Sequence, residues 1–161
     1  MPSNYPTKET ILEVELKYKP ALLSAIKEWK RTVWKEAKDS TPMNRFDALK
    51  ALVMIMATHY NKPVDVHYVP DLASCCYVPL TKTICMNRSL SIISTMHEFA
   101  HHLYGEDETK ACKWSVWLFK KTFPKSYEQL TWEGHMLVRR NPLMEYESEV
   151  ASFLKSQLNI N

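Results

Sequence analysis

The stretch from Ser89 to Lys113 reads SLSIISTMHEFAHHLYGEDETKACK and decides the fold of this chain. It contains the pattern H-E-x-x-H, from His97 to His101, inside a run of strong helical character. Residues four apart stand one above the other on a helix face, so both imidazoles can reach one cation. Glu98 turns to a neighbouring face, where its carboxylate can touch a metal-bound water without binding the metal. The stretch therefore predicts a catalytic zinc site in a groove beside the helix.

The helix that carries this pattern has a signal at each end. Ser89 is expected to be the N-cap, and Gly105, one of only two glycines, to be the left-handed residue that ends the helix. His102 falls on a different face and is expected at the surface. The competing interpretation is a partly buried helix with incidental histidines, because so short a pattern also arises by chance. Apolar residues at helical spacing predict a buried stripe of Ile92, Met96, Phe99 and Leu103.

Length and composition place the chain among ordinary globular proteins. Its 161 residues are enough for one domain with a substantial core, so we expect residues 1–161 to form a single domain. A net charge of +3 is too small to indicate nucleic-acid binding, and no apolar run approaches the length of a membrane span. The N-terminus is polar rather than signal-like, and we expect a cytoplasmic protein with reduced thiols and no membrane partner. Nothing in the sequence indicates an oligomeric state. The four cysteines have no C-x-x-C spacing: Cys75, Cys76, Cys85 and Cys112.

The periodicity on either side of the stretch predicts an α+β protein. A small antiparallel three-stranded sheet is expected to pack on the active-site helix, with flanking N- and C-terminal helices. The N-terminal helices occupy about 20–60, the sheet and active helices about 64–124, and the C-terminal segment 125–161. A polar segment at 125–129 leads to a turn at Trp132-Glu133-Gly134-His135. The predicted helices span about 20–37, 43–60, 89–104, 107–123 and 142–158, and the predicted strands span 64–69, 74–78 and 83–87.

A third protein ligand is expected downstream, because a catalytic zinc commonly takes three and leaves one position for water. The acidic candidates are Glu106, Asp107 and Glu108. We favour Glu108, which lies in the first turn of the following helix and can project back toward the metal, with Glu106 as the alternative. The other interpretation is that all three carboxylates simply favour the positive end of that helix dipole.

The run HEFAHHLYG, followed by ETKACKWSVWLFKKTFP, resembles the metallopeptidase core of the ImmA/IrrE-like proteins and other small gluzincins. In that family a second helix of the form E-x-x-A-x-x-F-A-x-x-L-x-x-P follows the H-E-x-x-H helix, and its first glutamate binds zinc. Glu108 and Ala111 match the E-x-x-A pattern, and Trp114 takes the aromatic place. The sequence departs in the shorter spacing from His101 to Glu108 and in Ser115, which replaces a small apolar residue. The resemblance covers roughly 64–124 and implies a minimal zincin-like fold with His97, His101 and Glu108 as zinc ligands.

On this interpretation the chain is a zinc metallopeptidase that hydrolyses peptide bonds of a peptide or protein substrate. Glu98 is the general base that accepts the proton of the zinc-bound water. A further donor should stabilise the oxyanion, and the sequence does not choose among three candidates: His135, Tyr104 and Tyr146. The edge of the hairpin at 74–87 could bind the substrate backbone as an added strand.

Two other functions remain open at this stage. The first is a regulatory or protein-interaction module with a mainly structural zinc, closed by Cys112 or His135 as a fourth ligand. The second is a nucleic-acid-associated protease whose basic first helix recruits it to DNA, against which the modest net charge argues. A thiolate site at Cys75, Cys76 and Cys85 is disfavoured because neighbouring strand residues point to opposite faces.

Overall fold

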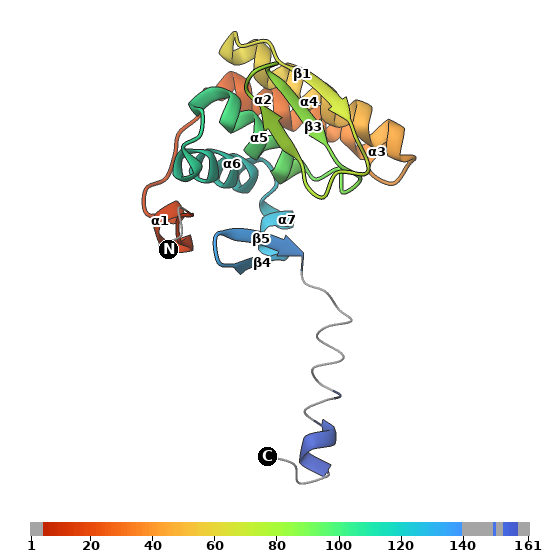
Figure 1. Ribbon diagram of the computed structural model, residues 1–161, viewed down its shortest axis with the longest axis vertical. Helices are drawn as coiled ribbons and strands as arrows, with labels where there is room; N and C mark the ends of the chain where they lie inside the picture. The colour runs from red at the N-terminus through yellow and green to blue at the C-terminus, as the bar shows by residue number, and fades with distance from the viewer. Residues whose placement is uncertain (1–4, 140–149, 151–152, 158–161) are drawn as a thin grey trace.

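The computed structural model describes residues 5–139, 150 and 153–157, and within them the chain is an α+β protein (Figure 1). This confirms the predicted class. No helix of the described residues is both long and apolar enough to cross a membrane. The helices are α1 (Lys8–Leu12), α2 (Pro20–Trp29), the π-helix η1 (Lys30–Trp34), α3 (Lys35–Ala37), α4 (Pro42–Tyr60), α5 (Ile92–Tyr104), α6 (Glu108–Thr122) and α7 (Pro124–Glu128). The strands are β1 (Asp65–Tyr68), β2 (Cys76–Val78), β3 (Thr83–Met86), β4 (Leu130–Glu133) and β5 (Met136–Arg139).

The helix predicted at about 20–37 forms as one continuous helical run, α2–η1–α3. Pro20 occupies its first turn, where the missing N–H would have no partner. The middle of the run widens into the π-helix Lys30–Trp34. π-Helical turns are rare and occur often at functional sites. The π-helix Lys30–Trp34 is therefore a candidate functional segment.

The three-stranded sheet differs from the prediction in the direction of one strand. Its order is β1-β3-β2, and β3 pairs antiparallel with β2 but parallel with β1. The prediction of an all-antiparallel sheet is therefore wrong. The cause is the connection at 69–75, which is long enough to carry the chain past the position of β3. As a result β2 forms at the outer edge, and the tight turn at 79–82 then returns β3 to the centre.

The α5 helix begins two residues later than the predicted N-cap at Ser89 implies. Ser91, and not Ser89, is the N-cap of α5, and its hydroxyl accepts a hydrogen bond from Ser94 N. The hydroxyl of Ser89 instead lies 2.6 Å from Asn87 Oδ1, and the intervening Leu90 has a φ of 47°. At the other end Gly105 has a φ of 71° and a ψ of −142°, which lies outside the predicted left-handed helical region. The positive φ still favours glycine there.

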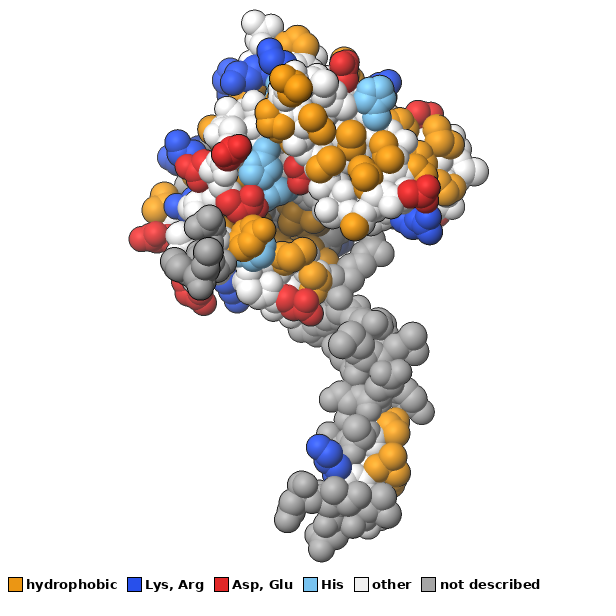
Figure 2. All heavy atoms as spheres, in the orientation of Figure 1, with side chains coloured by type: hydrophobic (Ala, Val, Ile, Leu, Met, Phe, Trp, Pro, Cys, Tyr) orange, Lys and Arg blue, Asp and Glu red, His pale blue; other side chains and the backbone are white. Residues whose placement is uncertain are grey.

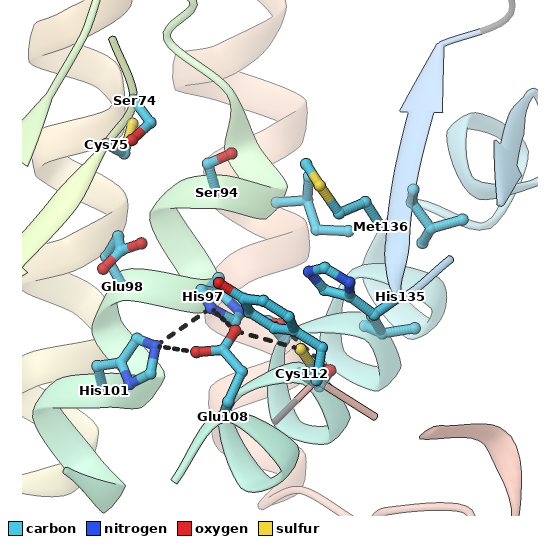
Figure 3. Close-up of a pocket in the computed structure, with 15 residues that line it drawn as sticks. Ser74, Cys75, Ser94, His97, Glu98, His101, Glu108, Cys112, His135 and Met136 are labelled. Carbon is cyan, nitrogen blue, oxygen red and sulfur yellow. Dashed lines mark hydrogen bonds and ion pairs between the residues drawn. The ribbon is translucent and has the colours of Figure 1, made fainter. Parts of the chain in front are cut away.

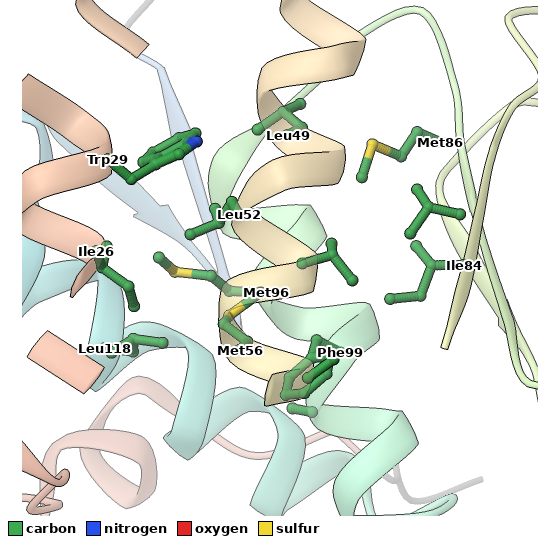
Figure 4. Packing of buried hydrophobic residues seen from close by; sticks show 14 of the residues in the cluster. Ile26, Trp29, Leu49, Leu52, Met56, Ile84, Met86, Met96, Phe99 and Leu118 are labelled. Carbon is green, nitrogen blue, oxygen red and sulfur yellow. The ribbon is translucent and has the colours of Figure 1, made fainter. Parts of the chain in front are cut away.

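The elements pack in three layers, with the sheet on one side, α4 and α5 in the middle, and α2 and α6 on the far side. Figure 4 shows the core between them, with Ile84 and Met86 from the sheet on one side of α4 and Ile26 and Leu118 on the other. Of the stripe predicted for α5, Met96 and Phe99 are fully buried, and Ile92 and Leu103 pack against the core while partly exposed. The α5 helix is thus held along its length by the main core.

The segment after α6 contains a β-hairpin, where the sequence predicted only a turn. β4 and β5 pair antiparallel, and Gly134, with a φ of 61°, and His135 form the turn between them. A small second cluster of Ile11, Cys112 and Val116 holds this hairpin and α1 against α6. The helix predicted at 142–158 falls largely outside the described residues, although Val150 and 153–157 are helical.

Candidate metal centre

The candidate site lies where α5 and α6 run side by side. A short turn at 105–107 joins them, and Asp107 caps α6 by accepting a hydrogen bond from Lys110 N. Ala100 and Ala111 are both fully buried, and their small side chains let the two helices approach closely. Glu108 is the first residue of α6 and projects toward the histidines of α5 (Figure 3).

Three ligand-type groups converge on one point. Glu108 Oε1 lies 2.8 Å from His97 Nε2, and Glu108 Oε2 lies 3.0 Å from His101 Nε2. The two imidazole Nε2 atoms are 3.2 Å apart. Atoms that bind a tetrahedral zinc at roughly 2.0–2.1 Å stand about 3.3 Å from one another. Two imidazoles and a carboxylate at these separations could hold a zinc ion.

Each histidine has a contact on its other ring nitrogen. His101 Nδ1 lies 2.7 Å from the carbonyl oxygen of Gly105. A carbonyl can only accept, so Nδ1 carries the proton and Nε2 keeps its lone pair in the neutral ring. His97 Nδ1 lies 3.5 Å from Ser115 Oγ, whose own proton is donated to Ala111 O at 2.8 Å. Both contacts favour the tautomer whose Nε2 is free to bind a metal.

The charges in the cluster respond to burial and to one another. Burial lowers the pKa of His97, and the neighbouring Glu108 carboxylate opposes that shift. Burial also raises the pKa of Glu98 to about 7, against the opposing effect of His101. Figure 3 shows Glu98 on the same helix as the two histidines, α5, and to the side of the three converging groups. It takes no part in the contacts that link these groups. Glu98 is therefore a titratable group beside the cluster and not a member of it.

Cys112 is a further potential ligand close to the cluster. Its Sγ donates to Glu108 Oε1 at 3.5 Å, one turn along α6. The ligand atoms of His97, Glu108 and Cys112 all lie within 4.8 Å of one another, so this set could also hold a metal ion. Burial raises the pKa of the Cys112 thiol to about 12, with the Glu108 carboxylate as a further cause. On geometry His101 is the stronger candidate ligand, because its Nε2 lies 3.2 Å from His97 Nε2 and 3.0 Å from Glu108 Oε2.

A wall from distant parts of the chain covers one side of the cluster. The rings of Tyr5 and His135 stack with centroids 4.1 Å apart and 6° between their planes. His135 belongs to the β4–β5 turn, and its charge contributes to lowering the pKa of His97. Together with Met136 these residues border a pocket of about 360 Å³ that also contains the two histidines, Glu98 and Glu108. Figure 2 shows histidine and acidic side chains beside a hollow between the helical body and this hairpin.

Two of the other predicted site residues, Glu106 and Tyr104, lie away from the cluster. Glu106 is exposed in the turn before α6. Tyr104 is 43% exposed at the end of α5 and does not line the pocket, so as placed it cannot serve as an oxyanion donor. Tyr146 lies outside the described residues.

His102 is not the surface residue that was expected. Its Nε2 donates to the carbonyl of Lys62 at 3.1 Å, which leaves Nδ1 to accept from the hydroxyl of Tyr77 at 2.7 Å in the neutral ring. This imidazole ties α5 to β2 and to the chain after α4. The three cysteines of the disfavoured thiolate site are not gathered at the cluster. Cys76 and Cys85 are opposite each other in the register of β2 and β3, and Cys75 lines the pocket on the far side of Glu98.

Two residues at the site, Ser115 and Tyr5, were not among the predicted site residues. In the sequence, Ser115 stood out only because it departs from the gluzincin pattern. Cys112 lies four residues and Ser115 seven residues after Glu108, and this spacing places all three on one face of α6. Tyr5 gave no signal, because its position depends on a long-range contact with the hairpin.

Comparisons with known protein families, with curated proteins and with solved structures gave no match. The resemblance to small gluzincins therefore stays a prediction from the residues and geometry of this chain.

Proposed function

We propose that this chain is a zinc-dependent metallopeptidase with His97, His101 and Glu108 as the metal ligands. The observation that carries the proposal is the convergence of two imidazole Nε2 atoms and one carboxylate within 2.8–3.2 Å. Two histidines and a glutamate are a ligand set of known zinc peptidases that leaves a position for water. Zinc bound there would polarise a peptide carbonyl and lower the pKa of water toward about 7.

Glu98 is the group that moves protons in this proposal. It follows His97 directly in the chain and borders the same pocket as the proposed ligands, so its carboxylate faces the space in which a metal-bound water would lie. It accepts a proton from the attacking water and donates it to the departing amide nitrogen. His135 lies across the pocket from Glu98 and is the side chain we assign to the oxyanion.

β2 provides a surface on which a substrate chain can be aligned. It is one of the two edge strands of the sheet, and it packs against α5. The backbone of Tyr77 in β2 lies close enough to Glu98 to lower the pKa of its carboxyl group, against the larger effect of burial, which raises it. An extended peptide added to this edge would therefore run beside the proposed general base.

The test is the substitution Glu98→Gln, with Glu106→Gln as the matched control on the exposed turn. Glu98→Gln should retain about one zinc per chain and the parental melting temperature, and should lose at least about 100-fold in cleavage of an unfolded protein substrate. Glu106→Gln should retain both properties. If Glu98→Gln cleaves as well as the parent, the proposed role of Glu98 is wrong.

A second candidate function is a module with a structural, closed zinc site. The observation that favours it is Cys112, whose sulfur is 3.5 Å from Glu108 Oε1. A closed site would lose much of its zinc affinity in Cys112→Ser and would hold no exchangeable water. The peptidase proposal expects Cys112→Ser to keep its zinc, because His101 supplies the third ligand.

A further inference from the structure

A second and larger cavity, of about 1030 Å³, opens on the other side of the first turn of α5. The helical run α2–η1–α3, the start of α4, the end of α6 and the β4–β5 hairpin all contribute to its lining. Four cationic side chains line it against the single carboxylate of Asp39: Lys30, Lys35, Lys38 and Arg45. The cavity is therefore strongly positive.

The cations of this cavity have no carboxylate partner among the ion pairs of the described residues. Lys30 donates to the carbonyl of Thr122 at 3.0 Å, and its pKa is lowered by burial and by the nearby charges of Lys125, Lys27 and Lys38. Arg45 donates through Nη2 to the carbonyl of Ser89 at 3.3 Å, while its buried Nε has no partner. Cations crowded in this way favour an anionic ligand.

One part of the cavity wall is apolar and aromatic. Phe119 and Phe123 stack at 5.4 Å, and Lys30 Nζ lies 4.5 Å from the ring of Phe123. Trp34 completes this side, and the π-helix Lys30–Trp34 lies along the cavity with both of its end residues in the lining. A small inorganic anion would leave such a wall without contacts. The ligand should carry apolar groups as well as negative charge.

This cavity lies directly beside the proposed metal centre. Ile93 in the first turn of α5 and Leu137 in β5 line both cavities. The two cavities are therefore separated by little more than these two side chains, and a chain bound at the proposed ligands would have only this distance to cover to reach the basic cavity.

We propose that this cavity binds an acidic segment with interspersed apolar residues in the protein substrate, next to the peptide bond that is cleaved. The inference rests on the proposed peptidase function and names its substrate class. A polypeptide is favoured over a nucleic acid because the cavity adjoins the pocket of the proposed peptidase centre and part of its wall is aliphatic and aromatic. Glutamate or aspartate side chains would meet the four cations, and leucine or phenylalanine side chains would cover the aromatic wall.

The test measures binding separately from cleavage. Fluorescence anisotropy with zinc-loaded Glu98→Gln protein would use a labelled peptide rich in glutamate and leucine. Two further probes are the same peptide with lysine in place of glutamate and a labelled single-stranded oligonucleotide. We expect the acidic peptide to bind at least about tenfold more tightly than the lysine peptide, and its affinity to fall as salt rises from about 0.05 to 0.5 M.

Variants then locate the binding site. The double substitution Lys35→Gln/Lys38→Gln should weaken the acidic peptide by roughly tenfold and flatten its salt dependence. The control Lys17→Gln/Lys50→Gln removes the same charge from exposed positions that line neither cavity, and it should bind like the parent. Both doubles should melt like the parent. Equal weakening in the two doubles, or tighter binding of the oligonucleotide than of the acidic peptide, would overturn the proposal.

Residues 141–149 are themselves acidic, with Glu145, Glu147 and Glu149, and are the competing occupant within the chain. If the peptide binds only after these three glutamates are changed to glutamine in the full chain, the cavity belongs to that segment and the proposal is wrong. Failure of the parent to cleave any peptide, with binding intact, would instead reject the peptidase function alone.

Discussion

The pocket at the candidate metal centre has two walls of different origin. The α5–α6 wall carries His97, His101 and Glu108, and both helices rest on the main core through fully buried residues such as Phe99 and Leu118. The covering wall carries Tyr5 and His135, which come from opposite ends of the described chain. Its elements are held by the small cluster around Ile11, Cys112 and Val116.

This difference in support matches the roles of the two walls in the proposed peptidase, which are to hold the metal and to contact a bound substrate. Ligand atoms must converge within about 0.5 Å of a working geometry, which requires side chains on rigid elements. A two-stranded hairpin alone is marginally stable, so the covering wall suits groups that approach a bound chain rather than groups that hold an ion. We therefore expect substitutions in the two walls to separate metal binding from catalysis.

The largest effect is expected at Glu108, the residue of the α5–α6 wall that contacts both histidines. Glu108→Ala should weaken zinc binding by more than about 100-fold, since it removes a direct ligand and not merely an outer-shell partner. Glu106→Ala, on the exposed turn, should change zinc affinity little. A competition titration with a fluorescent chelator measures both. The reverse order of effects would place the third ligand on the turn and remove the basis of the comparison.

The next effect is expected in the covering wall, at His135. His135→Ala should leave zinc affinity and the melting temperature nearly unchanged and should lower kcat by about 100-fold, as expected for loss of an oxyanion donor. Tyr5→Phe keeps the ring that stacks on His135 and serves as the control for packing. If His135→Ala loses its zinc, His135 is a ligand and the site is closed. If kcat stays at the parental value, the covering wall has no catalytic part.

The sequence predicted one wall far better than the other, for a physical reason. His97, His101 and Glu108 lie within one short stretch, and helix periodicity alone places the two histidines on one face. The pairing of β4 with β5 and the stacking of Tyr5 on His135 depend on long-range contacts that no local pattern encodes. Gly134 between Trp132 and Leu137 was a usable hairpin signal, because a glycine between two alternating apolar runs is typical of a tight turn.

The errors in the sheet and at Ser89 have the same origin. Alternation predicted the three strands but carries no information on their direction, which the path of 69–75 decides. Ser89 is a good N-cap by residue type, but Asn87 engages its hydroxyl and Leu90 turns the chain before the helix starts. Capping preference is local, whereas the entry of a buried chain into a helix is set by the core around it.

The smallest effect is expected inside the α5–α6 wall, at the contact that orients His97. Ser115 Oγ donates to Ala111 O at 2.8 Å, so it can only accept from His97 Nδ1 at 3.5 Å, the long limit of a hydrogen bond. Outer-shell partners of metal-bound histidines are typically worth 10–100-fold in affinity, and so long a contact should be worth less than about tenfold.

Thr122 offers a matched control for this last substitution, because its hydroxyl donates to Leu118 O at 2.7 Å on the same helix, away from the site. Ser115→Ala and Thr122→Val each remove one buried hydroxyl that bonds a carbonyl four residues earlier. Both should shift the melting temperature by similar small amounts, and only Ser115→Ala should weaken zinc binding. Equal zinc affinities would mean that the packing of α5 alone orients His97. A loss above 100-fold in Ser115→Ala would instead show that this hydroxyl, and not the core beneath α5, fixes the ligand geometry.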